Sequence, residues 1–272
     1  MQPSVQNILE IIHTLAPFDL AEKWDNSGLQ AGHLDGSVKK ILVGLDVSMA
    51  VMETAKAWGA DLVLTHHPLL MSPELSIDFG KMPGMALAMA AREKISIVSA
   101  HTNLDKAENG LNDYFAQRLG IECEEALEPE GLPVQWPGKL QGIGRLGQLT
   151  PGRTFKEFIA LVKKRLNLDH LRVTGDLNLM VQKVALCTGS GGSLVDAFLK
   201  SSADVYITGD VKYHEARKIE ALGKGLMDVG HFASEIIGVD LLVSRLNQAF
   251  LSLGYQVQIK GFKGEKDPFK IF

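Results

Sequence analysis

Cysteine is scarce in this sequence, and both an excess of positive charge and long apolar runs are missing. The two cysteines, Cys123 and Cys187, lack CxxC spacing, which argues against a disulfide framework or a zinc knuckle and favours reduced thiols. The net charge of −4 supplies no basic field for nucleic acid or an anionic membrane. No stretch approaches about 18 consecutive apolar residues, so we expect no membrane span.

The bulk composition is that of an ordinary soluble globular protein. Hydrophobic residues make up 46% and charged residues 22% of the 272 residues, enough for one large or two small domains. Residues 1–10 lack a basic segment followed by an apolar one, so we expect no signal peptide and a cytoplasmic protein.

Hydrophobic periodicity predicts that strands and helices alternate along the first half. This order is typical of an α/β fold with a mostly parallel sheet and helices on its faces. We expect helices at 5–15, 49–58, 85–93 and 109–119, and strands at 29–32, 40–47, 61–65 and 95–100.

The pattern returns after an acidic, then Pro- and Gly-rich connection at 122–142, which contains Trp136. Asp61 and Thr65 recur as Asp204 and Thr208 in similar strands, so we predict a diverged internal duplication. The expected domains are 1–125 and 126–272, with a C-terminal helix that is free to pack back on the first domain. In the second half we expect strands at 140–149, 171–173, 183–187, 203–210, 226–229 and 255–259, helices at 155–166, 194–200 and 236–253, and a turn at Pro151-Gly152.

Two adjacent histidines, His66 and His67, follow the strand at 61–65 and precede Pro68, which ends the strand. Neighbouring strand residues point to opposite faces, so this pair reaches two targets or straddles one site. Ligands of open α/β sheets bind outside the carboxyl ends of the strands, and we expect a metal there.

Two more strand ends carry a histidine four residues before a carboxylate. They are His101 with Asp105, and His231 with Glu235. Imidazole nitrogen and carboxylate oxygen are the ligands of zinc, iron or manganese sites. Five or six such groups suit two ions, which together activate a bridging hydroxide for hydrolysis.

Two other features of the second half are ambiguous. His214 lies where a counterpart of His66 and His67 is expected, and it is either a group near the metals or the start of a solvated helix. Gly189 to Ser193 reads as a tight turn, although its amides could receive an anion, and it lacks the lysine of a P-loop.

Five segments together resemble the dinuclear metal-centre hexameric protein family, also labelled GTP cyclohydrolase I type 2. They span most of the chain in order, and they are 24–29 (WDNSGL), 65–69 (THHPL), 101–105 (HTNLD), 209–214 (GDVKYH) and 229–235 (VGHFASE). The resemblance implies two similar α/β domains with the metals in the cleft between them, and a ring-shaped homohexamer. The chain lacks room for the extra middle domain of some members.

The resemblance also implies the roles of individual residues. Two divalent ions per subunit would be held by His66, His67, Asp105, His231 and Glu235, with Glu235 bridging and His101 close by without being a standard ligand. His101 and His214 are then the candidates for moving protons.

The implied activity is hydrolytic attack by a metal-bridging hydroxide on the purine C8 of GTP. A small-molecule substrate, possibly a nucleotide, is therefore expected. The metal chemistry equally supports a phosphoester or amide hydrolase. A metal-binding regulatory or scaffold ring without turnover is the alternative from a different class.

Overall fold

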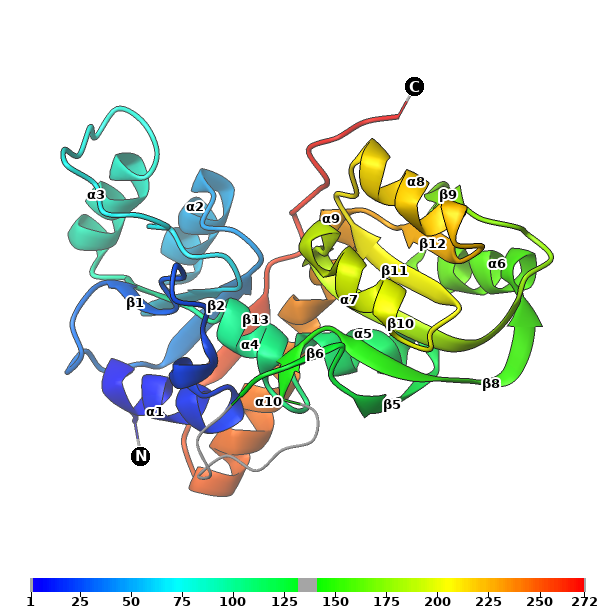
Figure 1. The fold of residues 1–272 in the computed structure, drawn as a ribbon. Helices are drawn as coiled ribbons and strands as arrows, with labels where there is room; N and C mark the ends of the chain where they lie inside the picture. Colours follow the sequence, from blue (N-terminus) through cyan, green and yellow to red (C-terminus); the bar gives the residue numbers. More distant parts are fainter. Residues whose placement is uncertain (1, 132–140, 272) are drawn as a thin grey trace. The chain divides into compact units, whose positions relative to one another are not determined.

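The computed structural model describes residues 2–131 and 141–271, which form two compact units (Figure 1). Unit 1 combines Met1–Leu104 with Gly238–Phe272, and unit 2 is Asp105–Ile237. The predicted boundary after residue 125 falls inside unit 2. Part of the predicted connection, including Trp136, lies outside the described residues.

Unit 1 is built on a five-stranded sheet in the order β1-β4-β3-β2-β13. The four strands from β4 to β13 are parallel, and β1 runs antiparallel to β4 along one edge. The carboxyl ends of β2, β3 and β4 therefore meet at one edge of the sheet. The bounds are β1 (Gly28–Ala31), β2 (Lys40–Gly44), β3 (Leu62–Thr65), β4 (Ser96–Ser99) and β13 (Gln258–Gly261).

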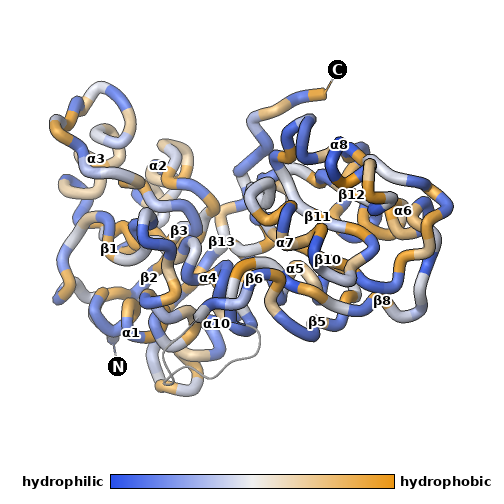
Figure 2. The backbone as a smooth tube through the Cα atoms, viewed as in Figure 1, coloured by the Kyte–Doolittle hydropathy of each residue, from blue (hydrophilic) through white to orange (hydrophobic). Residues whose placement is uncertain are grey.

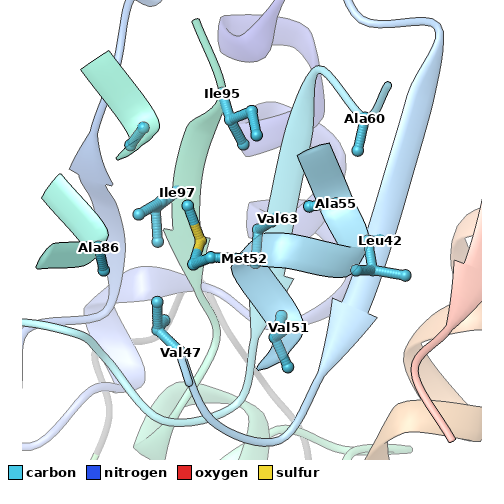
Figure 3. Close-up of a cluster of buried hydrophobic side chains, with 11 residues drawn as sticks. Leu42, Val47, Val51, Met52, Ala55, Ala60, Val63, Ala86, Ile95 and Ile97 are labelled. Atoms are coloured by element: carbon cyan, nitrogen blue, oxygen red, sulfur yellow. The ribbon is translucent and has the colours of Figure 1, made fainter. Parts of the chain in front are cut away.

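The helices of this unit begin where the sequence supplies caps. The hydroxyl of Ser4 caps α1 (Val5–Leu15) and that of Ser48 caps α2 (Met49–Trp58), each accepting a hydrogen bond from a backbone N–H of the first turn. Helix α2 and α3 (Gly84–Glu93) pack on one face of the sheet, where Met52, Val63 and Ile97 are fully buried (Figure 3).

Helix α10 (Ile237–Leu253) lies against the last strand of the sheet in unit 1. The side chain of Val239 comes close to Gly261 of β13, and Leu242, Leu246 and Phe250 are buried at helical spacing. By length and composition alone, the helical span His231–Leu253 is long and apolar enough to cross a membrane. Core helices pass the same test, so this is weak evidence for a membrane span.

Unit 2 contains a mixed six-stranded sheet in the order β5-β8-β10-β11-β12-β9. Strands β10, β11 and β12 are parallel, and β5, β8 and β9 are antiparallel to their neighbours. A separate short pair, β6 (Glu128–Pro129) with β7 (Gly142–Ile143), flanks the undescribed segment. The other bounds are β5 (Ile121–Glu125), β8 (Arg145–Thr154), β9 (Arg172–Thr174), β10 (Met180–Ser190), β11 (Val205–Gly209) and β12 (Gly225–Asp228).

Helices flank the sheet of unit 2 (Figure 2), and its parallel strands bury hydrophobic side chains such as Val184, Ile207 and Met227. Phe198 and Tyr206 stack within a buried cluster that includes residues of α7 and α8, while α5 and α6 contact β8 and β10. The helices of the chain not yet bounded are α4 (Thr102–Lys106), α5 (Leu111–Leu119), α6 (Phe155–Leu166), α7 (Val195–Lys200), α8 (Tyr213–Ala221) and α9 (His231–Glu235), with single 3₁₀ turns at Phe18–Leu20 and Gly192–Leu194.

The two sheets share one four-strand arrangement. Strands β1-β4-β3-β2 match β9-β12-β11-β10 in order and direction, and Ile41 pairs with Leu62 as Val184 pairs with Val205. Asp61 accepts hydrogen bonds from two backbone N–H groups at the start of β2, and Asp204 does the same at β10. These matches support the internal duplication, which stays a prediction.

One predicted turn is wrong. Pro151 and Gly152 do not end a strand, because β8 continues to Thr154. The register against β10 shifts between Val181 and Lys183, so the extra residues of β8 are accommodated as a bulge.

Candidate metal centre

Three histidines of unit 1 gather at the carboxyl edge of its sheet. His66 and His67 follow β3, and His101 follows β4. Their ring centroids lie 5.0 to 5.4 Å apart, and one ligand nitrogen from each lies within 4.8 Å of the others. The adjacent pair therefore straddles one site.

Each of these rings is anchored through Nδ1. His66 Nδ1 lies 2.9 Å from the carbonyl oxygen of Ala100, and His67 Nδ1 lies 2.8 Å from a carboxylate oxygen of Asp46. These oxygens accept hydrogen bonds, so the proton is on Nδ1 and the lone pair of the neutral ring is on Nε2. Second partners of this kind orient the ring and raise the basicity of a metal-binding histidine.

His101 is held in the same way, by the fully buried carboxylate of Asp25 at 2.8 Å. Asp25 also accepts hydrogen bonds from Ser27 and from the backbone N–H and hydroxyl of Thr102. Burial alone would raise the pKa of Asp25, but the hydrogen bonds from His101, Thr102 and Ser27 outweigh it and hold that pKa well below its usual range. Asp25 is therefore a fixed negative charge behind His101.

The carboxylates predicted as ligands are in unit 2, near the end of β10. Asp105 is buried on α4, and Thr188 donates a hydrogen bond to its carboxylate at 3.4 Å. Glu235 is buried at the end of α9. Burial raises the pKa of the Cys187 thiol, and Asp105 and Glu235 raise it further, so both carboxylates lie near this one sulfur.

His231 joins this group from the first residue of α9. Residues four apart on a helix share a face, and His231 Nε2 lies 2.9 Å from a carboxylate oxygen of Glu235. Its Nδ1 lies 2.8 Å from Asp210, so His231 has the same anchored arrangement as the histidines of unit 1.

Gly189 makes room for this pair. Its φ is +63°, and a Cβ placed on it would overlap the carboxylate of Glu235 and lie 3.4 Å from His231 Nε2. Gly189 belongs to the predicted turn, and what requires glycine there is the approach of Glu235.

The strand register corrects two sequence-based interpretations. The counterparts of His66 and His67 are Gly209 and Asp210, so His214 does not occupy their place. His214 is instead exposed on the first turn of α8, edge-on to Tyr213. The first residue after the matched strand ends is Ala100 in one half and Val229 in the other, which puts His231 one position beyond the counterpart of His101.

Each unit carries donor atoms of the types that bind a divalent metal of the zinc, iron or manganese class. Unit 1 offers imidazole nitrogens, and unit 2 offers two buried carboxylates and an imidazole. Nitrogen and oxygen ligands of this kind, backed by hydrogen-bonded partners, are the usual environment of such ions.

The anchoring aspartates were missed as functional residues. Asp25 lies in the WDNSGL segment and Asp210 in the GDVKYH segment, and neither was given a role. Asp46 had the weaker signal of an acid close to the end of a buried strand. In the structure Asp46 precedes His67, and Asp210 precedes His231, by the same spacing of 21 residues.

Comparison with known proteins identifies the family. The family model described as Duf34/NIF3 (NGG1p interacting factor 3) matches residues 3–268. The chain belongs to this family. A protein of Clostridium perfringens named GTP cyclohydrolase 1 type 2 homolog is 35% identical over 266 residues, which cover 98% of each chain.

Solved structures share the fold of this chain. The Bacillus cereus protein related to NIF3 superposes with a TM-score of 0.92 over 100% of both chains, at 24% identity. Reduced HcgD from Methanocaldococcus jannaschii is 31% identical, with a TM-score of 0.79 over 97% of this chain and 99% of its own. The predicted α/β fold is confirmed.

Proposed function

We propose that His66, His67, Asp105, His231 and Glu235 bind two divalent metal ions and that the protein is a metal-dependent hydrolase. The observation that carries this proposal is the anchoring of every histidine in the set through Nδ1, which directs Nε2 toward a ligand. The two buried carboxylates supply the negative charge that divalent ions require.

Two ions held by these side chains would supply Lewis acidity and a water of lowered pKa at neutral pH. The residues of the chain would bind the ions and orient their ligands. Glu235, which is buried and in contact with His231, would be the bridging carboxylate that the family resemblance implies, and the Nδ1 partners would hold the imidazoles in one tautomer.

His101 is the better supported of the two candidates for proton transfer. Asp25 keeps the proton on Nδ1, so Nε2 can accept a proton from an attacking water or, once protonated, donate one to a leaving group. The exposed His214 lacks such a carboxylate partner among the hydrogen bonds described for residues 2–131 and 141–271.

The substrate class is proposed from the relatives. Proteins named GTP cyclohydrolase 1 type 2 homolog match nearly the whole chain, so we propose a purine nucleotide, with GTP first, as the substrate. We also propose a cytoplasmic homohexamer, as the family resemblance implies.

The decisive experiment measures metal per chain in protein purified without chelator, for wild type, Glu235→Ala and the exposed control Glu122→Ala. About two ions per chain are expected in wild type and the control, and fewer than one in Glu235→Ala. The same samples are then incubated with GTP, the products are followed by mass spectrometry, and sedimentation gives the mass of the assembly.

Three outcomes would contradict parts of the proposal. Wild-type protein without metal would overturn the metal centre. Bound metal without hydrolysis of GTP or other nucleotides would favour the regulatory or scaffold ring. A mass below six chains would overturn the hexamer.

A further inference from the structure

The segment after β13 brings a carboxylate to the end of β2. Strand β13 pairs in parallel with β2 as far as Gly261 and Val43, and the backbone N–H of Phe262 then donates to the carbonyl oxygen of Val43. Three residues later, the partly buried side chain of Glu265 reaches the peptides that follow β2.

Glu265 binds two successive backbone N–H groups. Leu45 N lies 2.9 Å from both carboxylate oxygens, and Asp46 N lies 2.8 Å from Oε1. Successive N–H groups that point the same way form a concave site for an anion. Here the anion is a side chain of the protein itself.

The same peptide segment touches both adjacent histidines on its other side. The carbonyl oxygen of Gly44 accepts from His66 N at 3.3 Å, and that of Leu45 accepts from His67 N at 2.9 Å. The side chain of Asp46 then anchors His67 through Nδ1. Residues 44–46 therefore link the Glu265 carboxylate to the imidazole of His67.

The other half of the chain satisfies the equivalent N–H groups with side chains from distant segments. Counting along the chain from the last matched residues, Val43 of β2 and Leu186 of β10, Leu45 and Asp46 correspond to Thr188 and Gly189. Thr188 N donates to Asn112 Oδ1 and Gly189 N donates to Ser234 Oγ, both at 2.9 Å. In both units, side chains from distant segments thus bind the backbone N–H groups at the strand end beside the proposed ligands.

We infer that Glu265 is a positioning residue of the metal centre, fixing the Leu45–Asp46 peptide so that Asp46 holds His67 with its proton on Nδ1. This inference rests on the proposed function for the role of His67 as a ligand. The part of the inference that concerns the protein alone, in which Glu265 controls the His67 ring, applies to the metal-free protein as well.

The test compares Glu265→Ala and Glu265→Gln with Asp267→Asn. Asp267 is the matched control, because it is an exposed acid of the same tail that accepts only from the nearby Phe269 N among its described contacts. The first readout is long-range ¹H–¹⁵N NMR of the metal-free protein, which reports the tautomer of each histidine. The second is the dissociation constant for Zn²⁺.

In Glu265→Ala we expect His67 to lose its single Nδ1–H tautomer, and Zn²⁺ binding to weaken by about 10-fold, as for other partners behind metal ligands. Glu265→Gln keeps one acceptor oxygen and should fall between Ala and wild type. His101, which Asp25 holds, is the internal reference for correct folding and should keep its signal in all variants.

A His67 tautomer in Glu265→Ala that equals that of Asp267→Asn would overturn the inference. If wild-type protein binds no metal, the proposed function fails, while the NMR comparison still decides the role of Glu265. If metal binds and its affinity is the same in all variants, only the inference about Glu265 fails.

Discussion

Gly189 lies so close to Glu235 that a side chain at this position would displace the carboxylate. Its φ of +63° adds a second requirement for glycine. A residue without a side chain thus controls where a proposed metal ligand lies. A substitution here affects both the position of Glu235 and the backbone conformation, and the two effects can be measured separately.

We predict that Gly189→Ala removes most of the bound metal and lowers the free energy of unfolding by more than the roughly 1 to 2 kcal/mol that a left-handed alanine costs. The added methyl group pushes Glu235 away from His231. Metal analysis and urea denaturation of the purified variant measure both effects.

Gly223 provides the control for this prediction. Its φ is +68°, and nothing lies within 4 Å of an added Cβ. Gly223→Ala should therefore lower the free energy of unfolding only by the cost of a left-handed alanine, and the variant should keep its metal. Equal metal contents in the two variants would show that Gly189 has no special relation to Glu235.

At the scale of elements, the turn that contains Asp25 is fastened to the β4–α4 junction. Asp25 binds His101 and Thr102. The hydroxyl of Ser27 accepts from the backbone N–H of His101, and its single proton is shared between Asp25 and Asn103. The anchoring depends on the ionised form of Asp25, so the stability of this contact depends on pH.

We predict that Asp25→Asn lowers the free energy of unfolding by about 2 kcal/mol at pH 7, because it removes a charged acceptor of several hydrogen bonds. The pKa of Asp25 is lowered in the folded state, so its contribution is complete above the unfolded pKa of 3.8 and is lost as the pH falls through the folded pKa. The difference between wild type and variant should therefore shrink below about pH 4.

Urea denaturation of both proteins from pH 7 to pH 3 measures this difference. Asp196→Asn is the control, because Asp196 is an exposed partner of Lys218 and should change the free energy of unfolding by less than about 0.5 kcal/mol at any pH. A constant difference between wild type and Asp25→Asn over the whole range would contradict the prediction.

Local signals explain which elements could be predicted. The helices at Val5–Leu15, Met49–Trp58 and Phe155–Leu166 were predicted with their observed bounds, because a capping residue directly precedes each helix and apolar periodicity runs through it. The pairing of Asp25 with His101 spans 76 residues and leaves no local pattern. The bulge at Pro151-Gly152 depends on the partner strand, and the dipeptide alone is typical of a turn.

At the scale of the whole molecule, the proposed ligands come from both units. The sequence indicated these ligands because they lie at or just after predicted strand ends, and each strand end can be recognised from its own local pattern. We expected the C-terminal helix to be free to pack back on the first domain, but no local pattern indicated that β13 pairs with β2, because these strands lie far apart in the chain.

We predict that a chelator lowers the melting temperature of wild-type protein that contains metal by about 5 °C or more, since an ion held well above its dissociation constant contributes a few kcal/mol. Differential scanning calorimetry before and after dialysis against chelator measures the shift. Glu235→Ala should melt at the same temperature with and without chelator. An unchanged melting temperature in wild-type protein that has lost its metal would contradict a role of the ions in stability.

The return of the chain to unit 1 also bears on how the protein is made. Unit 2 is one uninterrupted segment, whereas unit 1 needs Gly238–Phe272 to finish its sheet. On the ribosome, where a chain grows at roughly 5 to 20 residues per second and domains fold as they emerge, unit 2 is available to fold first. The segment of unit 1 that precedes unit 2 then cannot complete its sheet. One edge of β2 stays unpaired until β13 and Glu265 are synthesised.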